Sequence, residues 1–278
     1  MQAVYHLPGL FEFYDLYKVF LPLFRSHRDW FYEWCGIGSI YGAPAGCRWG
    51  GGRAGFGEAE PEAAAALMRE YGISARLTFS NTLLREEDLT DDGCNRLCTL
   101  FDHNGPVPGG VILSSDLLLD YLQKMYPGFY FGASTTKVPT DFRLNKAWDR
   151  LGTLNREEKD KVEFLCNEAC WFECPDRKAC YENVSRKNLG EDCEEHRCVS
   201  PYAQRGYRFS DAMKNPGFIG IREIREIYLP MGFRHFKIEG RSLGSAMILE
   251  FLLHYLTCPE YQLRVREEIY LDSSLDLF

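Results

Sequence analysis

The polypeptide has 278 residues, and its 32 Lys and Arg against 40 Asp and Glu give a formal net charge of −8 at pH 7. Hydrophobic residues make up 45% and charged residues 26%, a globular mixture that excludes disordered, collagenous and coiled-coil chains. The acidic balance argues against an avid, nonspecific nucleic-acid binder, because neutralising phosphates requires surplus Lys and Arg.

The sequence predicts neither a membrane span nor an export signal. The stretch 1–20 has no basic region and no small-residue cleavage site. The most apolar runs, 20–24 and 246–253, are much shorter than the roughly 20 residues of a membrane-spanning helix. We therefore expect a cytoplasmic protein without membrane contacts, whose 11 cysteines are thiols or metal ligands rather than disulfides. The sequence sets no expectation for the oligomeric state.

Short strand-like runs alternate with helical segments along the chain. The expected strands span 4–7, 37–41, 75–79, 111–114, 129–134, 142–144, 162–166 and 234–238. The expected helices span 12–24, 61–71, 91–101, 115–125 and 242–256. This alternation predicts parallel strands joined by crossover helices, and eight strand–helix units predict one closed (β/α)8 barrel of the TIM type over residues 1–278.

The sixth strand carries the weakest signal of the eight. The stretch 137–145 around it contains a proline and few β-forming residues. An open, doubly wound sheet is therefore the alternative to a closed barrel.

A long insertion, about 166–217, separates the last two expected strands. A structureless segment of this length is uncommon in a compact domain and is usually functional. In a barrel it lies at the C-terminal face, where active sites are built. The insertion holds six cysteines: Cys166, Cys170, Cys174, Cys180, Cys193 and Cys198. Thiolates at this density are typical of zinc or iron–sulfur sites.

The spacing of these cysteines leaves the metal open. Structural zinc prefers two close pairs, and Cys170 with Cys174 forms one such pair. Cys193 with Cys198 comes near to a second. A four-iron cluster accepts irregular, widely separated thiolates. The other five cysteines are interpreted as buried packing residues: Cys35, Cys47, Cys94, Cys98 and Cys258.

Charged residues end the last expected strand. Lys237, Glu239 and Arg241 alternate there with apolar residues, and charges at the C-terminal end of a barrel strand are typical of catalytic or ligand-binding groups. We expect them to orient an anionic small substrate, with a purely structural ion-pair set as the alternative. Asn167 and Glu168 follow the preceding strand beside the cysteines and are candidates for contacting substrate or orienting metal ligands.

Several of these segments resemble a known family. VEFLCNEACWFECPDR at 162–177, RC at 197–198 and FKIEGR at 236–241, with a looser match in SIYGAP at 39–44, resemble the collagenase-like peptidase family, family 32 of the peptidases of unknown catalytic type. Members of that family look like (β/α)8 barrels, and several carry a [4Fe–4S] cluster on four cysteines.

The resemblance implies a ligand set for such a cluster. The cysteine pattern of the family carries over to Cys170, Cys174 and Cys198. Related sequences often have a histidine six positions after the second cysteine, and this chain has Cys180 there. The implied ligands are therefore these three and Cys180, with Cys193 in reserve, and zinc is the alternative metal.

The resemblance also implies a function. Better-understood members take part in oxygen-independent hydroxylation of RNA bases or of a quinone precursor, whereas others were named as collagenases. We therefore expect an iron–sulfur-cluster-dependent enzyme that acts on a small-molecule or modified-nucleotide substrate, with a redox partner protein. A collagenase-like peptidase is one alternative, although no nucleophile–base pair is visible in the sequence. The other alternative is a non-catalytic barrel whose Cys-rich segment is folded by a structural zinc.

Overall fold

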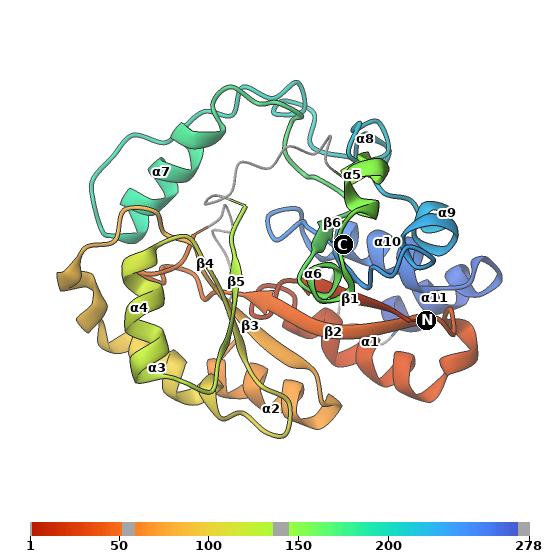
Figure 1. Ribbon diagram of the computed structural model, residues 1–278, viewed down its shortest axis with the longest axis horizontal. Helices are drawn as coiled ribbons and strands as arrows, with labels where there is room; N and C mark the ends of the chain where they lie inside the picture. Colours follow the sequence, from red (N-terminus) through yellow and green to blue (C-terminus); the bar gives the residue numbers. More distant parts are fainter. Residues whose placement is uncertain (1, 52–58, 136–144, 272–278) are drawn as a thin grey trace.

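One sheet of seven parallel strands organises the protein in the computed structural model, which describes residues 2–51, 59–135 and 145–271. The strand order is β5-β4-β3-β2-β1-β7-β6, so the strands follow one another around the sheet in chain order, and the last strand, β7, pairs with the first, β1 (Figure 1). The strands are β1 (Ala3–Pro8), β2 (Cys35–Gly42), β3 (Ser74–Phe79), β4 (Gly110–Leu113), β5 (Tyr130–Ala133), β6 (Glu163–Leu165) and β7 (His235–Lys237).

The predicted closed barrel of eight strands is wrong, because the sheet is an open, curled half-barrel. Within the described ranges, β5 and β6 are its two edges and pair on one side only. Seven of the eight expected strands are present, and the eighth, 142–144, lies outside the described residues. Alternation of strands and helices specifies that successive strands pair in parallel, but it does not specify closure. The strand order also differs from the doubly wound alternative, because it runs around the sheet in one direction.

Helices connect the strands and cover the outer face of the sheet (Figure 1). The longer ones are α1 (Tyr14–Ser26), α2 (Pro61–Tyr71), α3 (Asp92–Asp102), α4 (Asp116–Met125), α7 (Arg177–Asn188), α10 (Ser245–Leu256) and α11 (Gln262–Leu271). Short ones are α5 (Trp148–Gly152), α6 (Arg156–Asp160), α8 (Phe209–Ala212) and α9 (Ile221–Glu223), with single turns at Arg28–Trp30, Glu86–Thr90, Ile224–Tyr228 and Pro259–Tyr261. The five predicted helices are confirmed within three residues at each end. Among the described helices, none has the length and apolar character needed to span a bilayer.

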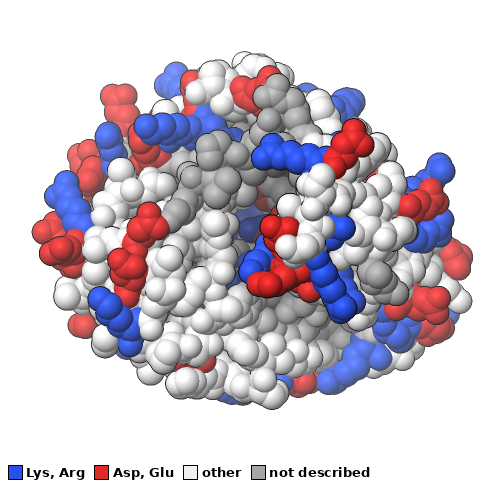
Figure 2. Space-filling model, viewed as in Figure 1, with Lys and Arg blue, Asp and Glu red and all other residues white. Residues whose placement is uncertain are grey.

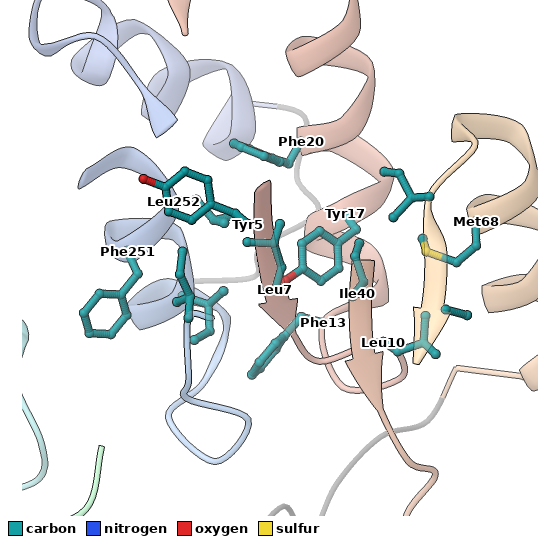
Figure 3. Packing of buried hydrophobic residues seen from close by; sticks show 14 of the residues in the cluster. Tyr5, Leu7, Leu10, Phe13, Tyr17, Phe20, Ile40, Met68, Phe251 and Leu252 are labelled. Carbon is teal, nitrogen blue, oxygen red and sulfur yellow. The ribbon is translucent and has the colours of Figure 1, made fainter. Parts of the chain in front are cut away.

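The hydrophobic core lies between the outer face of the sheet and these helices. Tyr5 and Leu7 of β1 point outward and are fully buried against side chains of α1 and α10, including Phe20 and Leu252 (Figure 3). Odd-numbered residues of β1 therefore face the core, and His6 between them faces the other way. The alternation of strand side chains thus divides an apolar outer face from a polar inner face.

Charged and polar side chains line the inner face, where a TIM barrel usually carries branched apolar residues. Arg76 of β3 reaches Glu163 of β6, with 2.5 Å between Nη1 and Oε2. These strands are four positions apart in the sheet, which is roughly 19 Å in a flat sheet at about 4.8 Å per strand. The sheet must therefore curl for the ion pair to form. Figure 2 shows acidic and basic side chains gathered in a hollow near the centre of the face that lies over β5 and β6 in Figure 1.

We predict that Glu163→Gln destabilises the fold. The substitution leaves Arg76 and Lys237 facing the inner side of the sheet without their counter-charge. Removing one partner of a buried ion pair costs about 3–5 kcal/mol, and we expect the lower end, because 24% of the Glu163 side chain is exposed. Urea denaturation checks the free energy of unfolding.

Glu157→Gln is the matched control, since Glu157 forms an exposed pair with Lys161. Its free energy of unfolding should stay within about 0.5 kcal/mol of the parent. Equal effects of the two substitutions would show that the inner ion pair does not hold the sheet curled.

Candidate active site and cysteine pocket

A small polar pocket, about 80 Å³ in volume, lies where the strands end. Its wall includes Tyr41 of β2, Thr78 of β3 and Lys237 of β7, and it continues through Glu239 and Arg241 just after β7. The carboxyl ends of parallel strands share one edge of a sheet, which is where α/β enzymes build their sites. The structure thus brings together three of the residues expected from the sequence, and we call this space the strand-end pocket.

Lys237 is the cation at the floor of the strand-end pocket. Its Nζ lies 3.8 Å from Oε1 of Glu163 and 4.3 Å from the centre of the Tyr41 ring. Burial lowers the pKa of Lys237, and the charge of Glu163 opposes that shift. Lys237 therefore connects the inner ion pair of the sheet to the pocket above it.

Arg241 is bound on several sides. Its guanidinium lies 2.5 Å from Oε1 of Glu12, a fully buried carboxylate in the segment after β1. The same group donates to the carbonyl oxygens of Gly51 and Ala43, at 3.2 and 3.1 Å. Gly51 must be glycine here, because a Cβ would lie 2.5 Å from the backbone carbon of Ser80. Arg241 therefore fastens the segments after β1 and β2 to the end of β7.

Asn167 and Glu168 lie behind the strand-end pocket and are not among the residues that line it. Asn167 is fully buried and locks the ends of β6 and β7 together, since it donates to the carbonyl oxygen of Glu239 at 3.0 Å and accepts from its N–H at 2.8 Å. The carboxylate of Glu239 accepts from the N–H of Ala169 at 3.2 Å. Asn167 is thus a positioning residue for Glu239.

Glu168 supports the loop that carries the first cysteine of the insertion. It accepts from the N–H of Cys170 at 2.9 Å and pairs with Arg177 at 3.0 Å. Burial and the neighbouring Glu239 raise the pKa of Glu168 to about 8, although Arg177 opposes the shift. The carboxyl group thereby connects the cysteine segment to α7.

A second pocket, about 170 Å³ in volume, gathers four of the cysteines of the insertion. Its lining includes Cys170, Cys174, Cys180 and Cys198, which we call the pocket cysteines. They come from the loop after β6, from the first turn of α7 and from the segment beyond α7. The other two cysteines of the insertion do not line it: the Sγ of Cys193 contacts Asn183 at 3.6 Å, and Cys166 is buried beside β6. His196 is a further lining residue.

The two pockets adjoin. Ala169, Tyr181 and Ser242 line both of them, so the pocket cysteines lie next to the charged ends of the strands. This arrangement places the insertion over the strand ends, as Figure 1 also shows for α7 and the segments around it. Across residues 2–51, 59–135 and 145–271, no three His, Cys, Asp or Glu side chains lie close enough together to hold a single metal ion.

The five cysteines outside the insertion behave differently. Cys35, Cys47, Cys94 and Cys98 are buried, which confirms their interpretation as interior residues, and Cys258 is half-buried. Two of these buried cysteines also contact each other, because the sulfur atoms of Cys47 and Cys94 lie 3.5 Å apart.

Several charged residues of the site were not predicted from the sequence. Arg76 is the only charged residue of β3 and Glu163 the only one of β6, and a lone charge in a buried strand is a signal that could have marked them. Glu12 stands between phenylalanines in the segment after β1, and His196 lies two residues before Cys198. The neighbouring sequence does not indicate which residues these side chains contact, because most of their partners come from distant parts of the chain.

His6 shows how strongly the inner face is screened from water. Its Nδ1 forms a hydrogen bond with the hydroxyl oxygen of Ser39 at 2.7 Å, and its Nε2 forms one with Nδ1 of His235 at 3.1 Å. Burial lowers the pKa of His6 to about 3, although the charge of Glu163 favours the protonated ring. His6 is therefore neutral at physiological pH and satisfied by hydrogen bonds.

Comparison with known proteins gives limited information. No protein-family model matches the chain, and no curated protein matches it. The chain is similar to the solved structure of the U32 peptidase Mk0906, with 17% identity, a TM-score of 0.49, and coverage of 86% of this chain and 93% of that one. Similarity at this level does not say which residues react or bind, so the function has to come from the contacts of this chain.

We predict that acid destabilises the protein through His6. The histidine takes up a proton near pH 6.5 in the unfolded chain, but only near pH 3 in the folded protein. The stability that neutral His6 contributes is therefore fully present above pH 6.5 and is lost as the pH falls from 6.5 to 3. The slope contributed by one such group is at most about 1.4 kcal/mol per pH unit. His6→Gln should flatten the pH dependence of the free energy of unfolding between pH 6 and pH 4, relative to the parent.

His103→Gln serves as the control, since His103 is an exposed histidine beside Asp102. We expect His6→Gln to flatten the slope more than His103→Gln does. If His6→Gln left the slope unchanged, His6 would not be buried in its neutral form.

Proposed function

We propose that the protein is an iron–sulfur-cluster-dependent enzyme, in which the pocket cysteines hold a [4Fe–4S] cluster beside the strand-end pocket. One observation carries the proposal: four thiols from separate parts of the insertion line a single pocket that shares its wall with the charged ends of the strands. Soft thiolate ligands suit iron–sulfur clusters and zinc. The sequence motifs similar to the collagenase-like peptidase family support Cys170, Cys174 and Cys198 as ligands, and Cys180 stands where related sequences often have a histidine.

Space and ligand spacing favour a cluster over a single ion. The pocket, at about 170 Å³, is many times the roughly 10–15 Å³ that one water molecule requires. Each thiolate of a four-iron cluster binds a different iron, so the four sulfurs need not approach as closely as around one ion. Zinc would need four ligands at about 2.3 Å from one centre. A zinc site with two close cysteine pairs would also need Cys193 beside Cys198, but the Sγ of Cys193 contacts Asn183 instead.

The strand-end pocket would receive the reacting part of the substrate. Lys237 supplies a positive charge for an anionic group, and Glu239, fixed by Asn167, supplies a hydrogen-bond acceptor. Arg241 would position the pocket rather than bind substrate, because its charge is already neutralised by Glu12. A bound cluster would supply electron transfer or Lewis acidity, with a redox partner protein as the electron source. Oxygen-independent hydroxylation of a small or nucleotide-borne substrate is the reaction class that the motif resemblance suggests.

Peptide hydrolysis is the second candidate, and it rests on the same motif resemblance. The two candidates differ in their dependence on the cluster. Hydrolysis of a gelatin-like substrate that persists after Cys174→Ala would favour the peptidase, whereas activity that disappears together with the iron would favour the cluster-dependent enzyme.

Metal analysis tests the proposal. Protein purified without oxygen should be brown and contain roughly four irons and four sulfides per chain. Cys174→Ala removes a thiol from the pocket and should lose most of the iron. Cys193→Ala removes a thiol outside the pocket and should keep it, which makes it the matched control.

Two outcomes would contradict the proposal. A colourless protein with one zinc per chain would favour the alternative of a structural zinc, and chelation should then unfold the insertion while the sheet persists. Equal iron loss from both variants would mean that the pocket does not define the ligands.

A further inference from the structure

A second group of thiols lies away from the pocket cysteines. Cys47 lies in the segment after β2, and Cys94 lies in the first turn of α3. Although 47 positions separate them in the sequence, their sulfur atoms are 3.5 Å apart. This distance is van der Waals contact, so a small rearrangement brings the two sulfurs to the bond length of a disulfide, about 2.05 Å.

The surroundings make the two thiols unequal. A hydrogen bond from Cys94 and the backbone N–H groups of Trp49 and Gly50 lower the pKa of Cys47, against the effects of burial and of the Asp91 carboxylate. The contact with Cys47 and burial raise the pKa of Cys94. Because the thiolate is the reactive form of cysteine, this asymmetry favours Cys47 as the nucleophile of the pair.

Small molecules can reach the pair from a pocket of about 410 Å³. Cys47 and Cys94 both line it, and its rim is formed by exposed residues such as Glu62 and Arg96. Only 8% of Cys47 is exposed, which excludes bulky disulfide reagents and admits a molecule the size of water. Cys98, one turn further along α3, does not line this pocket and is fully buried.

We propose that Cys47 and Cys94 form a peroxide-reactive dithiol site that closes into a reversible disulfide. The thiolate of Cys47 attacks one oxygen of hydrogen peroxide, the O–O bond breaks, and hydroxide leaves, which gives a sulfenic acid on Cys47. The sulfur of Cys94 then attacks that of Cys47, the S–O bond breaks, and water leaves. Overall, two thiols and one peroxide give one disulfide and two waters, with peroxide as the oxidant.

The disulfide would join the segment after β2 to α3. That segment also holds α7, because Asn188 donates to the carbonyl oxygen of Gly50 at 2.8 Å and Arg48 donates to that of Leu189 at 3.3 Å. The oxidised pair would therefore stiffen one of the supports of the cysteine pocket. The site itself does not depend on the proposed cluster.

Peptide mapping of the full chain, purified without oxygen and treated with hydrogen peroxide, tests the proposal. Trypsin cleaves the chain so that Cys94 lies alone in 86–96, apart from Cys98 in 97–124, while Cys47 lies in 29–48 with Cys35. We expect fragment 86–96 to be lost and to reappear joined to 29–48 through Cys47, and a thiol reductant should restore it. Fragmentation of the joined peptides distinguishes Cys47 from Cys35.

Two variants sharpen the result. Cys94→Ser should stop the reaction at the sulfenic acid of Cys47, which dimedone traps, whereas Cys98→Ser should leave the joined peptides as in the parent. The proposal is overturned if peroxide leaves both thiols of the parent protein free, oxidises Cys47 to a sulfinic acid, or joins Cys47 to Cys98. The mapping of the parent protein decides these outcomes even if a variant fails to fold.

Discussion

The curvature of the sheet depends on the carboxylate of Glu163 at its edge. Burial opposes ionisation, but Arg76, Lys237 and His6 lower the pKa of Glu163 to about 2, so the group is charged at all physiological pH values. A buried carboxylate is costly unless its counter-charges are in contact with it. Arg76 lies on β3, four positions from β6, so only a curled sheet brings it to Glu163, whereas Lys237 lies on the neighbouring strand β7. The same ion pairs place Lys237 at the floor of the strand-end pocket, so the fold and the site share one electrostatic constraint.

Much of the fold follows from local sequence patterns. The five predicted helices and seven of the eight predicted strands were found because their periodicity, caps and turn residues act over short distances; Ser115, for example, accepts from the N–H of Leu118 at the start of α4. The closed barrel was not correct, because the alternation of strands and helices does not specify whether the edge strands β5 and β6 pair with each other. The helix α7 was missed because it has no apolar stripe, and Ser185 is its only buried residue among those described.

The site was predictable in part for the same reason. The density of thiols marked the pocket cysteines, and the alternation in FKIEGR marked the charged end of β7. Roles could not be assigned without contacts. Arg241 looked like a substrate ligand until its partner Glu12 was seen, 229 positions away. Similarly, nothing in the sequence around Cys47 and Cys94 distinguishes them from packing cysteines, because their contact depends on how α3 lies against the segment after β2.

The central functional claim is that the pocket cysteines converge on one inorganic cluster next to the charged ends of the strands. Anomalous diffraction at the iron absorption edge, from crystals of protein purified and grown without oxygen, tests it most directly. We expect a strong iron signal inside the pocket, in contact with the sulfur atoms of Cys170, Cys174, Cys180 and Cys198. A signal at the zinc edge instead, iron bound elsewhere, or four separated thiols with no metal between them would contradict it.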